Sequence, residues 1–117
     1  MEQGDMAILI VEDEQDAAFL LNSYLTRKGY DVEIANNLKE AYLWFENYFF
    51  PIVLLDLNLP DGSGFDFLKW LNKSNKNCKV IINSAFDDEE ERERAKQMGV
   101  NHFLSKPTDF KKISSVL

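Results

Sequence analysis

Acidic, hydroxyl and amino side chains follow four short apolar segments of this sequence. Glu12 and Asp13 follow the first segment, and Asp56, Ser84 and Lys106 stand at the ends of three later ones. Carboxylates that share one site repel each other unless a cation neutralises them, and oxygen ligands without histidine or cysteine suit Mg²⁺ or Mn²⁺. A lysine suits a phosphate oxygen, and a hydroxyl can donate a hydrogen bond. Together these groups predict phosphoryl transfer to the carboxylate of Asp56.

The segments that carry these residues have the pattern of short strands that alternate with amphipathic helices. The continuous apolar run Ile52–Leu55 is typical of a strand that is buried on both faces, whereas Val32 and Ile34 alternate with polar residues as on an edge strand. The strands are expected at 7–11, 32–34, 52–55, 80–84 and 101–105. The helices are expected at 17–25, 38–49, 65–71 and 87–97, with a last helix that begins at Phe110.

Five such strand–helix repeats predict an α/β fold with a parallel sheet and helices on both faces. The expected architecture is the flavodoxin-like, doubly wound three-layer sandwich with strand order 2-1-3-4-5. Right-handed crossovers place the carboxyl ends of all strands at one edge of the sheet, and the first and third strands are neighbours. We therefore expect Asp13 and Asp56 to lie side by side.

Length and composition set the broad class of the protein. A chain of 117 residues suits one domain over 1–117, and its last helix is expected to be truncated at the C-terminus. The net charge of −7 argues against a nucleic-acid surface on this segment. One cysteine excludes an internal disulfide and favours a reducing compartment, and no apolar run is long enough to span a bilayer. We expect a cytoplasmic protein that does not bind membranes.

The combination of motifs resembles the receiver domain of two-component response regulators, the CheY-like superfamily, over nearly the whole chain. The matching residues are Glu12-Asp13, Asp56, the run Leu59–Gly64, Ser84-Ala85, Phe103 and Lys106-Pro107. By this resemblance, Asp56 is the phosphoacceptor. Asp13, Asp56 and the backbone carbonyl of Asn58 would bind Mg²⁺, and Glu12 would act through water.

The same resemblance implies a switch. Ser84 and Lys106 would hold the phosphoryl oxygens, and Phe103 would be the aromatic residue that turns inward when Ser84 moves toward the phosphate. Phe103 lacks the hydroxyl of the tyrosine that is commoner at this position. Phe86, two residues after Ser84, is expected to shield the acyl phosphate from water.

A sensor histidine kinase or a histidine phosphotransfer protein is the expected partner. Phosphorylation would change the face made by the fourth helix, the fifth strand and the fifth helix, which would control an output domain or a homodimer. Such a domain assists its own phosphorylation and dephosphorylation but is not an enzyme with a separate substrate. The fourth helix, at 87–97, is rich in charge, so it is expected to pack weakly and to suit such a switch.

Two alternatives belong to other functional classes. A flavin-binding electron carrier has the same fold, but Glu12, Asp13 and Glu14 would repel its phosphate. A receiver-like interaction module that is never phosphorylated would not need the intact set of acids, Ser84 and Lys106. Among the aromatic residues around 42–50, Trp44 and Phe50 are candidates for a partner surface.

Overall fold

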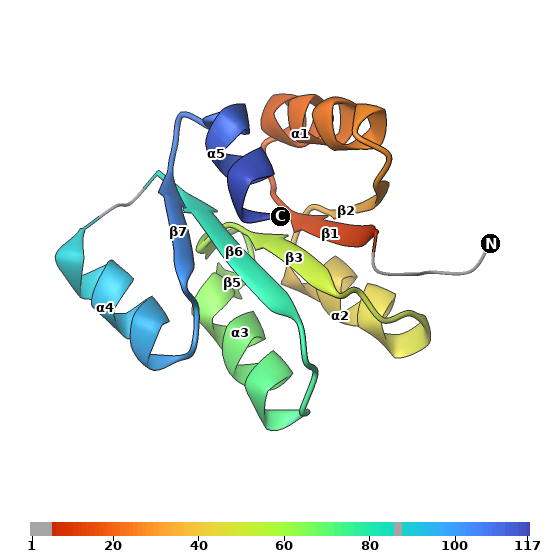
Figure 1. Ribbon diagram of the computed structural model, residues 1–117. Coiled ribbons are helices and arrows are strands. Elements are labelled where there is room, and N and C mark those ends of the chain that lie inside the picture. The colour runs from red at the N-terminus through yellow and green to blue at the C-terminus, as the bar shows by residue number, and fades with distance from the viewer. Residues whose placement is uncertain (1–5, 86–87) are drawn as a thin grey trace.

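The computed structural model describes residues 6–85 and 88–117 and contains a parallel five-stranded sheet with helices on both faces (Figure 1). The strands of this sheet are β1 (Ala7–Val11), β2 (Asp31–Ala35), β3 (Ile52–Leu55), β6 (Lys79–Ser84) and β7 (His102–Ser105). The helices are α1 (Gln15–Arg27), α2 (Leu38–Asn47), α3 (Gly64–Lys73), α4 (Glu89–Gln97) and α5 (Phe110–Val116). The sheet order β2-β1-β3-β6-β7 confirms the predicted order of the five strands and the doubly wound, flavodoxin-like fold.

Two hydrophobic clusters fill the spaces on either side of the sheet. Alternate residues of a strand point to opposite faces, so β1 contributes to both clusters. Leu9 and Val11 join the cluster that includes buried residues of α2, α3 and α4, whereas Ile8 and Ile10 join the cluster that includes α1 and α5. Because the central strands are buried on both faces, the edge where they end is held in a fixed position.

A short antiparallel hairpin of β4 (Asn58–Leu59) and β5 (Gly62–Ser63) follows β3. Asp61 lies at the tip of this hairpin. Its carboxylate accepts hydrogen bonds from the backbone N–H groups of Leu38 at 2.8 Å and Lys39 at 3.1 Å. These are unpaired donors in the first turn of α2, so the loop after β3 caps a helix that is distant in sequence.

Replacing Asp61 by alanine should lower the free energy of unfolding by about 1 kcal/mol near neutral pH, as loss of a helix N-cap does. The N–H groups of Leu38 and Lys39 lower the pKa of the Asp61 carboxyl. A lowered pKa stabilises the fold above the ordinary aspartate pKa of about 3.9, and this gain disappears as the pH falls through the lowered value. Urea unfolding of wild type and variant, near pH 7 and near pH 3, measures the difference. If wild type and variant differ in stability by the same amount at both pH values, a role for the charge of Asp61 is contradicted.

The first two helices differ in part from what their apolar residues suggest. Within the helix expected at 17–25, Leu20 is 54% exposed, whereas Ala18 is buried. The second helix ends at Asn47 rather than Phe49, because the chain turns to extended backbone at Tyr48. Phe49 is consequently exposed at the surface.

The suggestion that Phe50 marks a partner surface is wrong. Phe50 is completely buried and packs edge-on against Phe45 and Trp44. Trp44 is half-buried and donates its indole N–H to the carbonyl oxygen of Ile34 at 3.2 Å. Both side chains therefore hold α2 on the sheet.

Among the helices in the described part of the chain, none combines the length and the apolar character that a membrane crossing needs.

Candidate functional site

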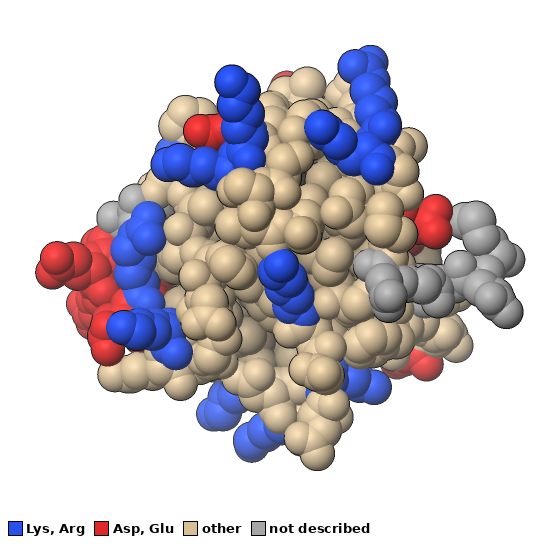
Figure 2. All heavy atoms as spheres, in the orientation of Figure 1, with Lys and Arg blue, Asp and Glu red and all other residues tan. Residues whose placement is uncertain are grey.

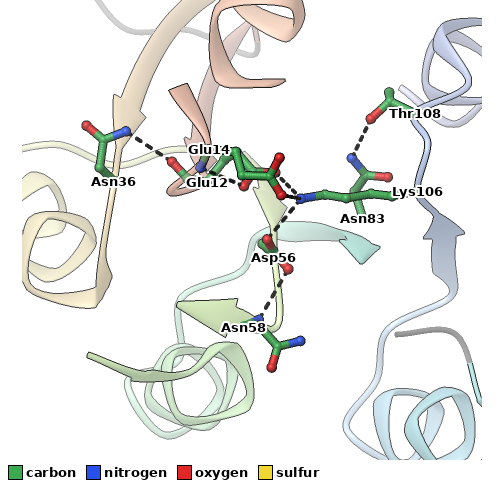
Figure 3. Close-up of polar contacts among 8 residues, drawn as sticks. All are labelled: Glu12, Glu14, Asn36, Asp56, Asn58, Asn83, Lys106 and Thr108. Carbon is green, nitrogen blue, oxygen red and sulfur yellow. Dashed lines mark hydrogen bonds and ion pairs between the residues drawn. The ribbon is translucent and has the colours of Figure 1, made fainter. Parts of the chain in front are cut away.

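The loops after β1 and β3 bring Glu12 and Asp56 together (Figure 3). The two strands are parallel neighbours, with Val11 opposite Leu55. The backbone N–H of Asp56 donates to the carbonyl oxygen of Val11 at 3.0 Å, and the N–H of Glu12 donates to that of Ala35 at 2.9 Å. These bonds extend the sheet by one residue beyond each strand and fix the first acids that follow.

Glu12, Asp13 and Asp56 each place a carboxylate oxygen within 4.8 Å of those of the other two. Glu12 is 2% exposed and Asp56 is 6% exposed, whereas Asp13 lies in solvent. Burial raises the pKa of the Glu12 carboxyl, although a hydrogen bond from Lys106 opposes this change. The expected neighbours Asp13 and Asp56 are thus confirmed as neighbours, in a cluster that is costly to bury without a cation.

Lys106 supplies the only amino group that the described structure pairs with these acids. Its Nζ lies 2.6 Å from Glu12, 3.0 Å from Asp56 and 3.7 Å from Glu14, and its side chain is 13% exposed. Burial lowers the pKa of Lys106, but hydrogen bonds to Glu12 and Asp56 outweigh it and raise that pKa. Lys106 is therefore charged at neutral pH and lies against the Asp56 carboxylate.

The composition of this cluster fits a small divalent cation. Lys106 pairs with the carboxylates of Glu12, Glu14 and Asp56. Asp13 adds a further carboxylate to the cluster, so these described residues together keep an excess of negative charge. Carboxylate oxygens are hard ligands of the kind that Mg²⁺ and Mn²⁺ prefer. A bound ion of this kind would supply positive charge and relieve the repulsion among the acids.

A backbone donor and a side-chain donor each hold one oxygen of Asp56. The N–H of Asn58 donates to its Oδ1 at 3.2 Å, while Lys106 holds its Oδ2. Gly64, the first residue of α3, donates its N–H to the carbonyl oxygen of Leu57 at 2.9 Å. A Cβ at position 64 would overlap the backbone carbonyl of Asp56, so only glycine lets α3 approach the site this closely.

Ser84 lies on β6, the strand beside β3, and Phe103 lies on β7, the edge strand beyond it. Ser84 is completely buried at the end of β6, and its carbonyl oxygen accepts the backbone N–H of Lys106 at 2.8 Å. Phe103 pairs with Ile82 in the β6–β7 ladder and is half-buried. Its ring contacts the guanidinium of Arg92 rather than any of the clustered acids. The predicted role of Phe86 concerns a residue outside the described ranges.

Sequence reasoning missed three contributors to this site. Glu14 reaches Lys106, Asn36 donates its side-chain N–H to the carbonyl oxygen of Glu12 at 3.0 Å, and Gly64 provides the close approach of α3. Glu14 and Gly64 stand within motifs that the sequence displays. Nothing in the sequence marks Asn36, because its contact depends on how β2 lies beside β1.

A groove of about 520 Å³ opens beside the cluster, between α1 and the loop before α5. It is lined by the polar Glu14, Lys106 and Thr108 and by the apolar Leu20, Pro107 and Phe110. An incoming group can therefore approach Lys106 from the α1 side.

Comparisons with known proteins agree on one family. The family model described as "Response regulator receiver domain" matches residues 8–117. The transcriptional regulatory protein CusR of Escherichia coli K12 is 31% identical over 105 residues, which cover 90% of this chain and 46% of CusR. The chain thus spans about half the length of this curated relative.

Solved structures agree with this assignment. The signal receiver domain of a putative Luxo repressor protein from Vibrio parahaemolyticus superimposes with a TM-score of 0.91 at 29% identity, over 97% of this chain and 87% of that one. A response regulator protein from Burkholderia pseudomallei, solved with a phosphorylated aspartic acid, a calcium ion and citrate, has a TM-score of 0.88 at 25% identity. That match covers 97% of this chain and 66% of the other.

Proposed function

This chain belongs to the family of response regulator receiver domains of two-component systems, and we propose that it is a signalling switch controlled by phosphorylation of Asp56. The observation that carries the proposal is the position of the Asp56 carboxylate. It lies 3.0 Å from the Nζ of Lys106, accepts the N–H of Asn58 and shares a cluster with Glu12 and Asp13. A carboxylate among a fixed cation, a fixed donor and further hard ligands has the partners that phosphoryl transfer requires.

In the transfer step, a carboxylate oxygen of Asp56 forms a bond to phosphorus. The bond from phosphorus to a histidine nitrogen of the donor breaks, and its electron pair stays on that nitrogen. Lys106 moves its positive charge from the carboxylate to a phosphoryl oxygen, and the hydroxyl of Ser84 donates to another. Asp56 and Lys106 directly follow β3 and β7 and are already in contact, so these two groups need little rearrangement for the step.

Glu12, Asp13, Asp56 and the backbone carbonyl of Asn58 are the groups proposed to hold Mg²⁺, with Glu12 acting through water. Bound Mg²⁺ would neutralise charge that develops on the phosphoryl oxygens. Mn²⁺ has the same ligand preference and is expected to substitute for it. The Burkholderia pseudomallei relative was solved with both a phosphorylated aspartic acid and a calcium ion, which supports the expectation of a divalent cation in this chain.

The proposed partners are a sensor histidine kinase or a histidine phosphotransfer protein in the cytoplasm. Phosphorylation would draw Ser84 toward the phosphoryl group and turn Phe103 inward, which changes the face made by α4, β7 and α5. In the numbering of the structure, β7 is the fifth strand of the sheet. This face would then act on an output domain or on a second copy of the chain, and the receiver would turn over no separate substrate.

Incubation with a small-molecule phosphodonor tests the proposal. We expect wild type to gain one phosphoryl group per chain when Mg²⁺ is present, and to gain little when a chelator removes the metal. Asp56→Asn, which keeps the shape of the side chain, should gain none. Intact-mass measurement reads all three reactions. An unlabelled wild type would favour the interaction module that is never phosphorylated.

A further inference from the structure

Helix α4 has little apolar contact with the rest of the domain. Ala95 is its one buried residue, and its first turn carries Glu89, Glu90 and Glu91. Figure 2 shows acidic side chains gathered at the α4 end of the visible face, with Lys and Arg side chains beside them. A helix with so little buried surface depends on its polar side chains for its position.

Two arginines of α4 supply contacts with aromatic rings. The guanidinium carbon of Arg92 lies 4.8 Å from the ring centroid of Phe103 on β7, and that of Arg94 lies 4.2 Å from the ring centroid of Phe65 on α3. Both distances are within the range of cation–π attraction. The two contacts differ in one respect, because only Phe103 is a residue that the proposed switch moves.

Arg92 is also tied to the strand that carries Phe103. Its Nη1 donates to the carbonyl oxygen of Phe103 at 3.2 Å, and its Nη2 donates to the side-chain oxygen of Ser105 at 3.3 Å. These two hydrogen bonds fix the plane of the guanidinium relative to β7. If the ring of Phe103 rotated toward Ser84, the guanidinium could not follow it without breaking these bonds.

We propose that Arg92 is a positioning residue that holds Phe103 in its resting orientation and so opposes the phosphorylated state. This inference rests on the proposed function, since it assigns Arg92 a role in the same switch. An interaction made in one state only biases the equilibrium toward that state. Removing the Arg92 contacts should therefore strengthen the binding of any ligand that favours the phosphorylated state. The gain in affinity should equal the factor by which these contacts favoured the resting state.

Beryllofluoride with Mg²⁺ is a suitable probe, because it mimics an acyl phosphate on an aspartate without a covalent step. We expect Arg92→Ala to lower the apparent dissociation constant of beryllofluoride by roughly two- to fivefold, the factor that corresponds to a cation–π contact at an exposed site. Fluorine NMR of the bound probe measures this constant. Arg94→Ala is the matched control, because it removes the same type of side chain two residues along the same helix, and its affinity should equal that of wild type.

A second pair of variants links the effect to the ring. In a Phe103→Leu background, Arg92→Ala should leave the affinity unchanged, because there is no ring to hold. Arg92→Lys keeps the charge but loses the planar, two-donor contact, so it should tighten binding partway. If thermal melting shows that Arg92→Ala does not fold, Arg92→Lys takes its place as the test variant.

Three results would overturn the inference. These are unchanged or weaker binding by Arg92→Ala, equal tightening by Arg94→Ala, and an undiminished effect of Arg92→Ala in the Phe103→Leu background. Equal binding of beryllofluoride by wild type and Asp56→Asn would instead overturn the proposed function, and the inference with it.

Discussion

Replacing Lys106 by methionine should destabilise the fold near neutral pH and slow the phosphorylation of Asp56. Lys106 is the cation that contacts the buried carboxylates of Glu12 and Asp56, at 2.6 Å and 3.0 Å. Removing one partner of a buried ion pair leaves an uncompensated charge, which costs roughly 3 kcal/mol. For a domain of this size, the melting temperature should fall on the order of 10 °C.

The stability lost on replacing Lys106 by methionine should increase from acidic to neutral pH. The raised pKa of Lys106 means that its stabilising contribution is complete below the ordinary lysine pKa of about 10.4 and is lost only at higher pH. In the variant, Glu12 keeps the burial that raises its pKa but loses the opposing hydrogen bond. The variant should therefore lose stability as the pH rises above the ordinary glutamate value of about 4.3, so its difference from wild type widens toward neutral pH.

Thermal melting over a pH series measures this difference, and added Mg²⁺ should return part of the lost stability by replacing the missing charge. The rate of phosphorylation should fall at least about tenfold, since 1.4 kcal/mol of lost charge stabilisation already accounts for that factor. Glu14→Gln is the control, because it removes an exposed carboxylate 3.7 Å from the same Nζ. A solvent-exposed pair contributes little, so this change should stay within about 0.5 kcal/mol. Equal losses of stability in Lys106→Met and Glu14→Gln would contradict the claim that Lys106 is the cation that compensates the buried carboxylates.

The substitution Gly64→Ala should cost roughly 3 kcal/mol of stability and impair phosphorylation at the same time. The added methyl group would overlap the backbone carbonyl of Asp56 and would lie 3.0 Å from the Cα of Leu57. Backbone atoms in a packed core cannot yield as a flexible side chain can, so either α3 or the end of β3 must shift. A shift of β3 would carry Asp56, the proposed phosphoacceptor, away from Lys106.

Gly99→Ala separates this packing effect from a general effect of removing glycine. Gly99 has a φ of +91°, and a Cβ there would meet no atom within 4 Å in the described structure. Alanine at this position should therefore cost about 1 kcal/mol of backbone strain, with phosphorylation unchanged. Urea unfolding and phosphodonor labelling of both variants provide the comparison. Normal labelling of Gly64→Ala would contradict the tight packing of α3 against Asp56.

The order of the sheet was predictable because strands buried on both faces leave a strong sequence signal. The apolar run 52–55 indicated a strand buried on both faces, and the alternation around Val32 and Ile34 indicated an edge strand; both predictions are confirmed. Helix boundaries were less predictable, because local backbone geometry decides them. Phe49 fits the apolar period of α2, yet the chain leaves the helix before reaching it.

The neighbouring positions of Asp13 and Asp56 followed from topology alone, because parallel strands end at one edge of the sheet. The position of Lys106 at the same edge followed in the same way. Contacts that depend on side-chain reach did not follow from the sequence. Asn36, the residue after β2, supports the loop of Glu12, and the side chain of Arg92 reaches from α4 to β7. Such contacts need the distance between two elements, which no local pattern encodes.

The most direct test of the central claim is to locate the phosphoryl group. Wild type is treated with a phosphodonor and Mg²⁺ and then reduced with borohydride, which converts an acyl phosphate to an alcohol. Peptide mass spectrometry then identifies the residue that was modified. The structure predicts modification at Asp56 alone, with Glu12 and Asp13 unchanged. Modification at either of those acids, or equal labelling of wild type and Asp56→Asn, would contradict it.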